Sequence, residues 1–171
     1  GFDVPAGMKN PTSGDFSVML NSVYAAQHPH HFVYRGYEVE TTGNELTHVV
    51  LRGAVNTRGV CIPNYHYEDM IHLITMYEKM DLKYPAAIVD SNHSNSNKQY
   101  AEQIRIVKEV MHNRQLSEPI HRLVKGVMIE SYIEPGSQGV HDHIYGKSIT
   151  DPCLGWEESE KLIYDIAEMN R

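Results

Sequence analysis

The sequence repeats one local order four times, and this order constrains the fold more than any other feature. Each repeat has a short run of β-branched and apolar residues, then a polar loop, then a segment whose apolar residues follow the 3.6-residue spacing of a helix. The runs predict strands at residues 4–8, 48–51, 86–89 and 126–129, and the periodic segments predict helices at residues 15–27, 65–80, 98–113 and 157–169. Alternating strands and helices favour parallel βα units, so we predict an α/β fold.

One segment interrupts this order between the first and second units. Residues 31–34 and 37–41 are rich in β-formers and flank Arg35 and Gly36, which favour a turn. We therefore predict an inserted β-hairpin at residues 31–44. From the pattern alone, a regulatory or interfacial role and a plain surface hairpin are equally compatible with it.

Composition excludes several classes of partner. The chain has 15 Lys and Arg against 22 Asp and Glu, a net charge of −7, and no basic cluster, which argues against nucleic acid as the main ligand. The longest apolar runs have only a few residues, so no membrane span is predicted. Cys61 and Cys153 form neither a disulfide framework nor a zinc pattern, which predicts a reducing, cytoplasmic compartment.

Length sets a further limit. The 171 residues suit a single domain, residues 1–171, but fall short of the roughly 250 residues of a complete eight-stranded α/β barrel. The sequence starts at Gly1 without a Met, and we interpret this start as a cut end.

Polar and charged residues follow the predicted strands at the edge where parallel α/β folds place their sites. They are Lys9, Arg52, Asp90 with His93, Glu130 and, in the last loop, Asp151. Two cations beside an imidazole and carboxylates suit a phosphorylated anion next to a divalent metal. The alternatives are ordinary surface cations, a loop-capping histidine, a solvated glutamate and an N-capping aspartate.

Two other histidine-containing stretches invite a metal interpretation. Residues 28–31 and residues 141–143 resemble chelating tracts, but both lie among turn-forming residues. We interpret both as solvated loops.

Six segments, in this order along the chain, resemble the 3-deoxy-D-arabino-heptulosonate-7-phosphate (DAHP) synthase family in its aldolase class I form. They are GMKNPTSG at 7–14, VVLRG at 49–53, PNY at 63–65, VDSNHSNSNKQ at 89–99, GVMIES at 126–131 and YGKSITDPCLGW at 145–156. Each segment is modestly specific, whereas six in one order are strongly so.

This resemblance implies a TIM (β/α)8-barrel fold, of which the chain would be the C-terminal half, strands five to eight, with the inserted hairpin. The implied reaction condenses phosphoenolpyruvate with erythrose 4-phosphate and water, giving DAHP and phosphate, as the first step of the shikimate pathway of aromatic amino acid biosynthesis. Lys9, also a catalytic candidate, and Arg52 would hold phosphoenolpyruvate. His93, Glu130 and Asp151 would be three of four ligands of a divalent metal, with Mn, Fe, Co and Zn equally acceptable.

The chain also departs from the family pattern. The family's first four strands carry a Cys metal ligand and further substrate-binding cations, and neither Cys61 nor Cys153 lies at that ligand's position. We therefore expect the isolated chain to be inactive, or nearly so, and to need an N-terminal half or self-association. The alternatives are a non-catalytic half-barrel that serves binding or assembly, and a related synthase that joins phosphoenolpyruvate to another sugar phosphate.

Overall fold

A four-stranded parallel sheet forms the centre of the protein. The computed structural model describes residues 4–170, and its main strands are β1 (Gly7–Lys9), β4 (His48–Leu51), β7 (Ala87–Asp90) and β8 (Val124–Met128). They lie in the order β1-β4-β7-β8, and each neighbouring pair is parallel. The order in space therefore follows the order in the chain, and the predicted α/β class with a parallel sheet is confirmed.

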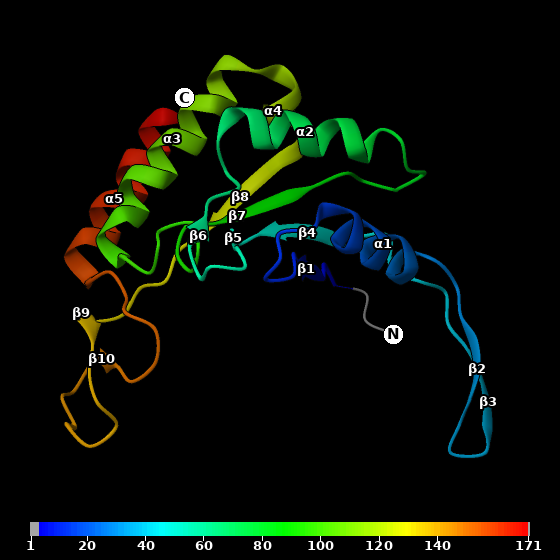
Figure 1. Ribbon diagram of the computed structural model, residues 1–171, viewed down its shortest axis with the longest axis horizontal. Helices are drawn as coiled ribbons and strands as arrows, with labels where there is room; N and C mark the ends of the chain where they lie inside the picture. The colour runs from blue at the N-terminus through cyan, green and yellow to red at the C-terminus, as the bar shows by residue number, and fades with distance from the viewer. Residues whose placement is uncertain (1–3, 171) are drawn as a thin grey trace.

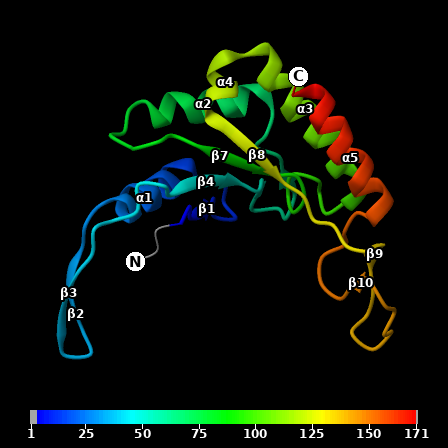
Figure 2. The same cartoon turned by 180° about the vertical axis from the view of Figure 1, so that it is seen from behind.

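Helices follow the strands and lie on one side of the sheet (Figures 1 and 2). They are α1 (Phe16–Gln27), α2 (Tyr67–Tyr77), α3 (Gln103–Leu116), α4 (Glu118–Leu123) and α5 (Trp156–Met169), with a 3₁₀ turn, η1 (Tyr100–Glu102), before α3. Helix α4 was not predicted, because six residues are too few to show a helical period. Within residues 4–170, no helix is long and apolar enough to cross a membrane.

Three small strand pairs lie outside the main sheet. Strands β2 (His31–Tyr34) and β3 (Tyr37–Glu40) form an antiparallel hairpin that projects from one end of the molecule (Figure 1). The loop after β4 contains the short pair β5 (Ala54–Val55) and β6 (Cys61–Ile62), and the loop after β8 contains β9 (Glu134–Ser137) and β10 (Lys147–Ser148). The sequence predicted only loops for the last two pairs, because strands of two to four residues leave almost no alternation to detect.

The hydrophobic core lies between the sheet and its helices. Val49 and Leu51 of β4 and Val89 of β7 pack there with buried residues of α1 to α4. A second cluster joins α3 to α5 around Leu154 and Leu162. On α5 the apolar residues do not all face the core, because Ile163 is 60% exposed whereas its neighbour Leu162 is buried.

The opposite face of the sheet, which we call the inner face, has no helix over it among the described residues (Figure 1). Side chains alternate between the two faces of a strand, so Val50, Ile88 and Met128 belong to this inner face. Parallel sheets are normally covered on both faces. The inner face is therefore the unusual surface of this fold, and its carboxyl end carries most of the polar groups discussed next.

Candidate metal and anion site

The candidate site lies at the carboxyl end of the inner face. Lys9 and Asp90 are the last residues of β1 and β7, and Arg52 and Glu130 follow β4 and β8 by one and two residues. Arg52, Asp90 and Glu130 each lie two residues beyond an inner-face residue of their own strand, and Lys9 lies two residues beyond Gly7, which faces the inner-face Val50. Alternation therefore directs all four to the same face. The parallel topology thus brings together groups that are far apart in sequence.

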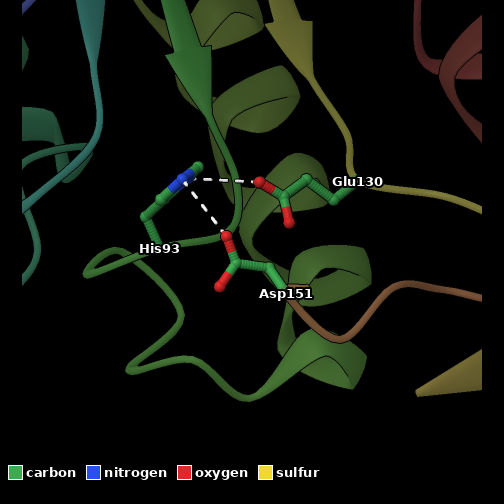
Figure 3. A group of neighbouring side chains, drawn as sticks. All are labelled: His93, Glu130 and Asp151. Carbon is green, nitrogen blue, oxygen red and sulfur yellow. Dashed lines mark ion pairs between the residues drawn. The ribbon is translucent and has the colours of Figure 1, made fainter. Parts of the chain in front are cut away.

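Three potential metal ligands converge at this edge (Figure 3). His93 comes from the loop after β7, Glu130 follows β8, and Asp151 lies between β10 and α5. His93 Nδ1 is 3.4 Å from Glu130 Oε1, and His93 Nε2 is 3.9 Å from Asp151 Oδ2. One ligand atom from each residue lies within 4.8 Å of the other two. The structure therefore gathers all three predicted ligands into one group, which we call the triad.

A buried carboxylate links the triad to the first cation. Asp90 is fully buried, and its Oδ2 accepts a hydrogen bond from Lys9 Nζ at 2.8 Å. The same oxygen is 2.9 Å from His93 Nδ1. One oxygen of Asp90 therefore contacts both the Lys9 ammonium and the His93 ring.

The environment of His93 suits a metal ion. Its Nδ1 is buried and, among the described residues, has no hydrogen-bond partner, because the short contact with Asp90 lacks hydrogen-bond geometry. The His93 backbone has φ of +49°, in the left-handed region that non-glycine residues seldom occupy outside special sites. Imidazole with two carboxylates is a donor set that first-row divalent ions accept. The residues present thus fit a divalent metal.

A small cavity next to the triad is lined by further cationic groups. Arg52 and Lys98 line it together with His93, Ser94 and Asp151. Within residues 4–170, the Arg52 guanidinium takes part in no ion pair, so its planar fork remains available to an anion. The site therefore pairs an acidic triad with cations that can hold a phosphate or carboxylate.

A network of buried asparagines fixes the strand ends to one another. Asn10 accepts from the Arg52 backbone N–H at 2.9 Å and donates to the Gly53 carbonyl at 2.8 Å. Asn95 donates to the carbonyls of Leu51 and Asp90 at 3.1 and 2.8 Å. These bonds join the ends of β1, β4 and β7. Neither asparagine lines the cavity.

Gly53 allows this close packing. Its φ is +75°, and a Cβ atom there would lie 2.7 Å from the Asn95 backbone nitrogen. Only glycine fits such an approach without moving the backbone. The end of β4 can therefore lie directly against the loop that carries His93.

From the sequence, Asp90 was one of the strand-end candidates but had no individual role, and Asn92, Lys98 and Gln103 had no role, although all four lie at or behind the triad. Lys98 could have been found, because it is a cation in the same segment as His93, residues 89–99. The amides had none, because a buried Asn or Gln looks like any loop or helix residue in the sequence.

The remaining candidates lie apart from the triad. Neither Cys61 nor Cys153 joins it, although the Cys153 Sγ contacts the Asp151 carbonyl at 3.4 Å. Both thiols are free, and burial raises the pKa of the Cys153 thiol. Residues 28–31 and 141–143 gather no group of three potential ligands in the described part of the chain.

Comparison with known proteins places this geometry in a family. Residues 1–163 match the model of the DAHP synthetase I family. A phospho-2-dehydro-3-deoxyheptonate aldolase of Haemophilus influenzae is 35% identical over 98% of this chain and 46% of its own length. A Trp-sensitive enzyme of the same name from Enterobacter agglomerans is 36% identical over 96% of this chain and 47% of its own length.

A solved structure agrees with these relatives. The phospho-2-dehydro-3-deoxyheptonate aldolase of Francisella tularensis superimposes with a TM-score of 0.86 at 32% identity, covering 99% of this chain and 49% of that one. The chain therefore spans about half the length of the relatives it matches.

Proposed function

Because this chain belongs to the DAHP synthetase I family, we propose that it provides part of the active site of a 3-deoxy-7-phosphoheptulonate synthase. The reaction joins phosphoenolpyruvate, erythrose 4-phosphate and water to give DAHP and phosphate, at the start of the shikimate pathway. One observation carries the proposal: the triad, Lys9 and Arg52 meet at one edge of the inner face.

In this proposal His93, Glu130 and Asp151 hold a divalent ion, whose Lewis acidity would polarise the aldehyde of erythrose 4-phosphate. This donor set suits Mn, Fe, Co and Zn alike. The fourth ligand of the family pattern comes from outside this chain.

Arg52 and Lys9 hold phosphoenolpyruvate through different kinds of interaction. The Arg52 fork can bind two oxygens of one anionic group, which fixes its orientation. Lys9 adds a compact charge whose position is set by its 2.8 Å bond to Asp90. Holding the substrate in one orientation beside the triad supplies much of the effective concentration that a condensation between two substrates needs.

Charge balance supports an anionic substrate. Lys9, Arg52 and Lys98 offset the carboxylates of Asp90, Glu130 and Asp151, so the site is close to neutral before any ion binds. A divalent cation would leave it positive, and a positive pocket attracts phosphorylated anions.

We also propose that residues 1–171 form one domain, strands five to eight of a (β/α)8 barrel, with residues 31–44 as the inserted hairpin. The uncovered inner face and the half-length match to relatives support this. Within the described residues, β1 and β8 each have a neighbour on one side only, so an N-terminal half or a second copy can pair with these edges. The two free cysteines support a reducing, cytoplasmic location.

A phosphate-release assay tests the proposal. With phosphoenolpyruvate, erythrose 4-phosphate and Mn²⁺, the 171-residue chain should show negligible turnover. Adding the separately expressed N-terminal half of the Haemophilus influenzae relative should restore turnover, and Arg52→Ala should reduce it. Robust turnover by the chain alone would contradict the proposal that it provides only part of the active site.

A second candidate, a non-catalytic binding or assembly module, rests on the open edges of β1 and β8. It predicts a stable complex with the added half that releases no phosphate, while the synthase predicts both the complex and turnover.

A further inference from the structure

Glu130 lies two residues beyond β8, and its carbonyl accepts a hydrogen bond from the Leu154 backbone N–H at 3.0 Å. The side-chain amide of Gln103 binds both the N–H and the carbonyl of Glu130. Gln103 Oε1 accepts from the Glu130 backbone N–H at 2.8 Å, and Gln103 Nε2 donates to the Glu130 carbonyl at 3.0 Å. Gln103 therefore pairs with the Glu130 N–H and shares the Glu130 carbonyl with Leu154.

Gln103 is itself held rigidly. It is the first residue of α3 and is fully buried. Its Oε1 also accepts from Ser91 Oγ at 3.1 Å, and Ser91 lies two residues before His93. One buried side chain thus contacts both the segment that leads to His93 and the peptide group of Glu130.

The carboxylate of Glu130 is oriented by a second amide. Asn92, which is 2% exposed, donates from Nδ2 to Glu130 Oε2 at 2.7 Å and accepts from Ser96 Oγ at 2.7 Å. Oε2 is therefore engaged, while Oε1 is the oxygen that lies 3.4 Å from His93 Nδ1. The Glu130 backbone, held by Gln103 and Leu154, and the Glu130 carboxylate, held by Asn92, are thus fixed independently by residues outside the triad.

We propose that Gln103 is a positioning residue that, together with Asn92, sets Glu130 in place before a metal binds. The inference rests on the proposed function, because it assumes that the triad is a metal site. Groups that orient metal ligands are needed for affinity, and their loss typically costs about 10- to 100-fold in metal binding. A preset ligand lowers the ordering that binding would otherwise require.

The chain contains a matched control. Gln27 is also buried, at 6% exposed, and its amide also bridges backbone groups. It donates to the carbonyls of Thr47 and Lys83 at 3.0 and 2.9 Å and accepts from the Lys83 N–H at 2.8 Å. Thr47 precedes β4, so this bridge lies at the opposite end of the sheet from the triad. Replacing either glutamine by Met removes the same chemistry at nearly constant volume.

The test measures Mn²⁺ binding by the 171-residue protein, following free Mn²⁺ by electron paramagnetic resonance, with the thermal midpoint of each variant recorded in parallel. We expect Gln103→Met to raise the dissociation constant by about 10-fold or more. Gln27→Met should change it by less than about twofold while lowering the thermal midpoint to a comparable extent, because both variants leave buried backbone groups unpaired.

Each outcome decides the matter. Wild-type affinity in Gln103→Met, or equal losses in the two variants, would overturn the positioning role and leave the metal site intact. Absence of Mn²⁺ binding by the wild type would overturn the metal site and this inference together. If Gln103→Met does not fold, Asn92→Ala replaces it: a rise of about 10-fold supports the proposal, and unchanged affinity overturns it.

Discussion

The ion pair between Lys9 and Asp90 allows a prediction whose size follows from burial. Asp90 is fully buried, whereas the Lys9 side chain is 36% exposed. Replacing Lys9 by Met leaves the Asp90 carboxylate with the Asn92 backbone N–H at 3.1 Å and the His93 ring as its nearest polar neighbours. Breaking a fully buried pair on one side costs about 3–5 kcal/mol. The partial exposure of Lys9 reduces this, and we expect Lys9→Met to lower the free energy of unfolding by about 2 kcal/mol.

A double-mutant cycle isolates the energy of the interaction between Lys9 and Asp90. Asp90→Asn removes the charge but retains the shape of the side chain, so in that background Lys9→Met should cost only about 0.5 kcal/mol. Urea denaturation of the wild type, both single variants and the double variant gives all four free energies. Equal costs of Lys9→Met in the two backgrounds would refute the argument that Lys9 compensates a buried charge.

Three further predictions concern groups around the sheet. Asn95→Ala should lower the free energy of unfolding by about 2 kcal/mol, as measured by urea denaturation, because it leaves the carbonyls of Leu51 and Asp90 unpaired; a loss below about 0.5 kcal/mol would contradict this. Burial raises the pKa of Tyr77 to about 12, so the stability that its neutral phenol contributes is complete below pH 10 and is lost as the pH rises towards 12. Tyr77→Phe should therefore flatten the plot of unfolding free energy against pH between pH 10 and 12, and an unchanged plot would contradict this. Because burial raises the pKa of the Cys153 thiol, iodoacetamide should modify it in the native protein more slowly than in urea at the same pH, as followed by mass spectrometry, and equal rates would disprove this.

The sequence predicted the parts of the fold that periodicity encodes. Strand β4 was predicted at its observed bounds, and the parallel sheet followed from the alternation of strands and helices. Strand β1 was placed three residues too early, at residue 4 rather than Gly7, because pairing with β4 begins only where Gly7 meets His48. Amphipathic spacing does not reveal what lies beside a helix, so it could not show that Ile163 of α5 is exposed while Leu162 is buried.

Most of the candidate site was predictable because its residues follow strand ends. Lys9, Arg52 and Glu130 could be found because a parallel sheet brings strand ends together. Gln103 could not, because it opens a helix 27 positions before Glu130 and no short-range pattern connects the two. Such long-range hydrogen bonds depend on packing, which a single sequence does not display.

The proposed function requires a metal ion on the triad and an anion held by a separate cation, Arg52. Isothermal titration calorimetry tests both requirements. The wild type, His93→Ala and Arg52→Ala forms of the 171-residue protein are each titrated with Mn²⁺ and then with phosphoenolpyruvate. We predict one Mn²⁺ site in the wild type, loss of that site in His93→Ala, and retained Mn²⁺ binding with weakened phosphoenolpyruvate binding in Arg52→Ala. Wild-type Mn²⁺ affinity in His93→Ala would contradict the account.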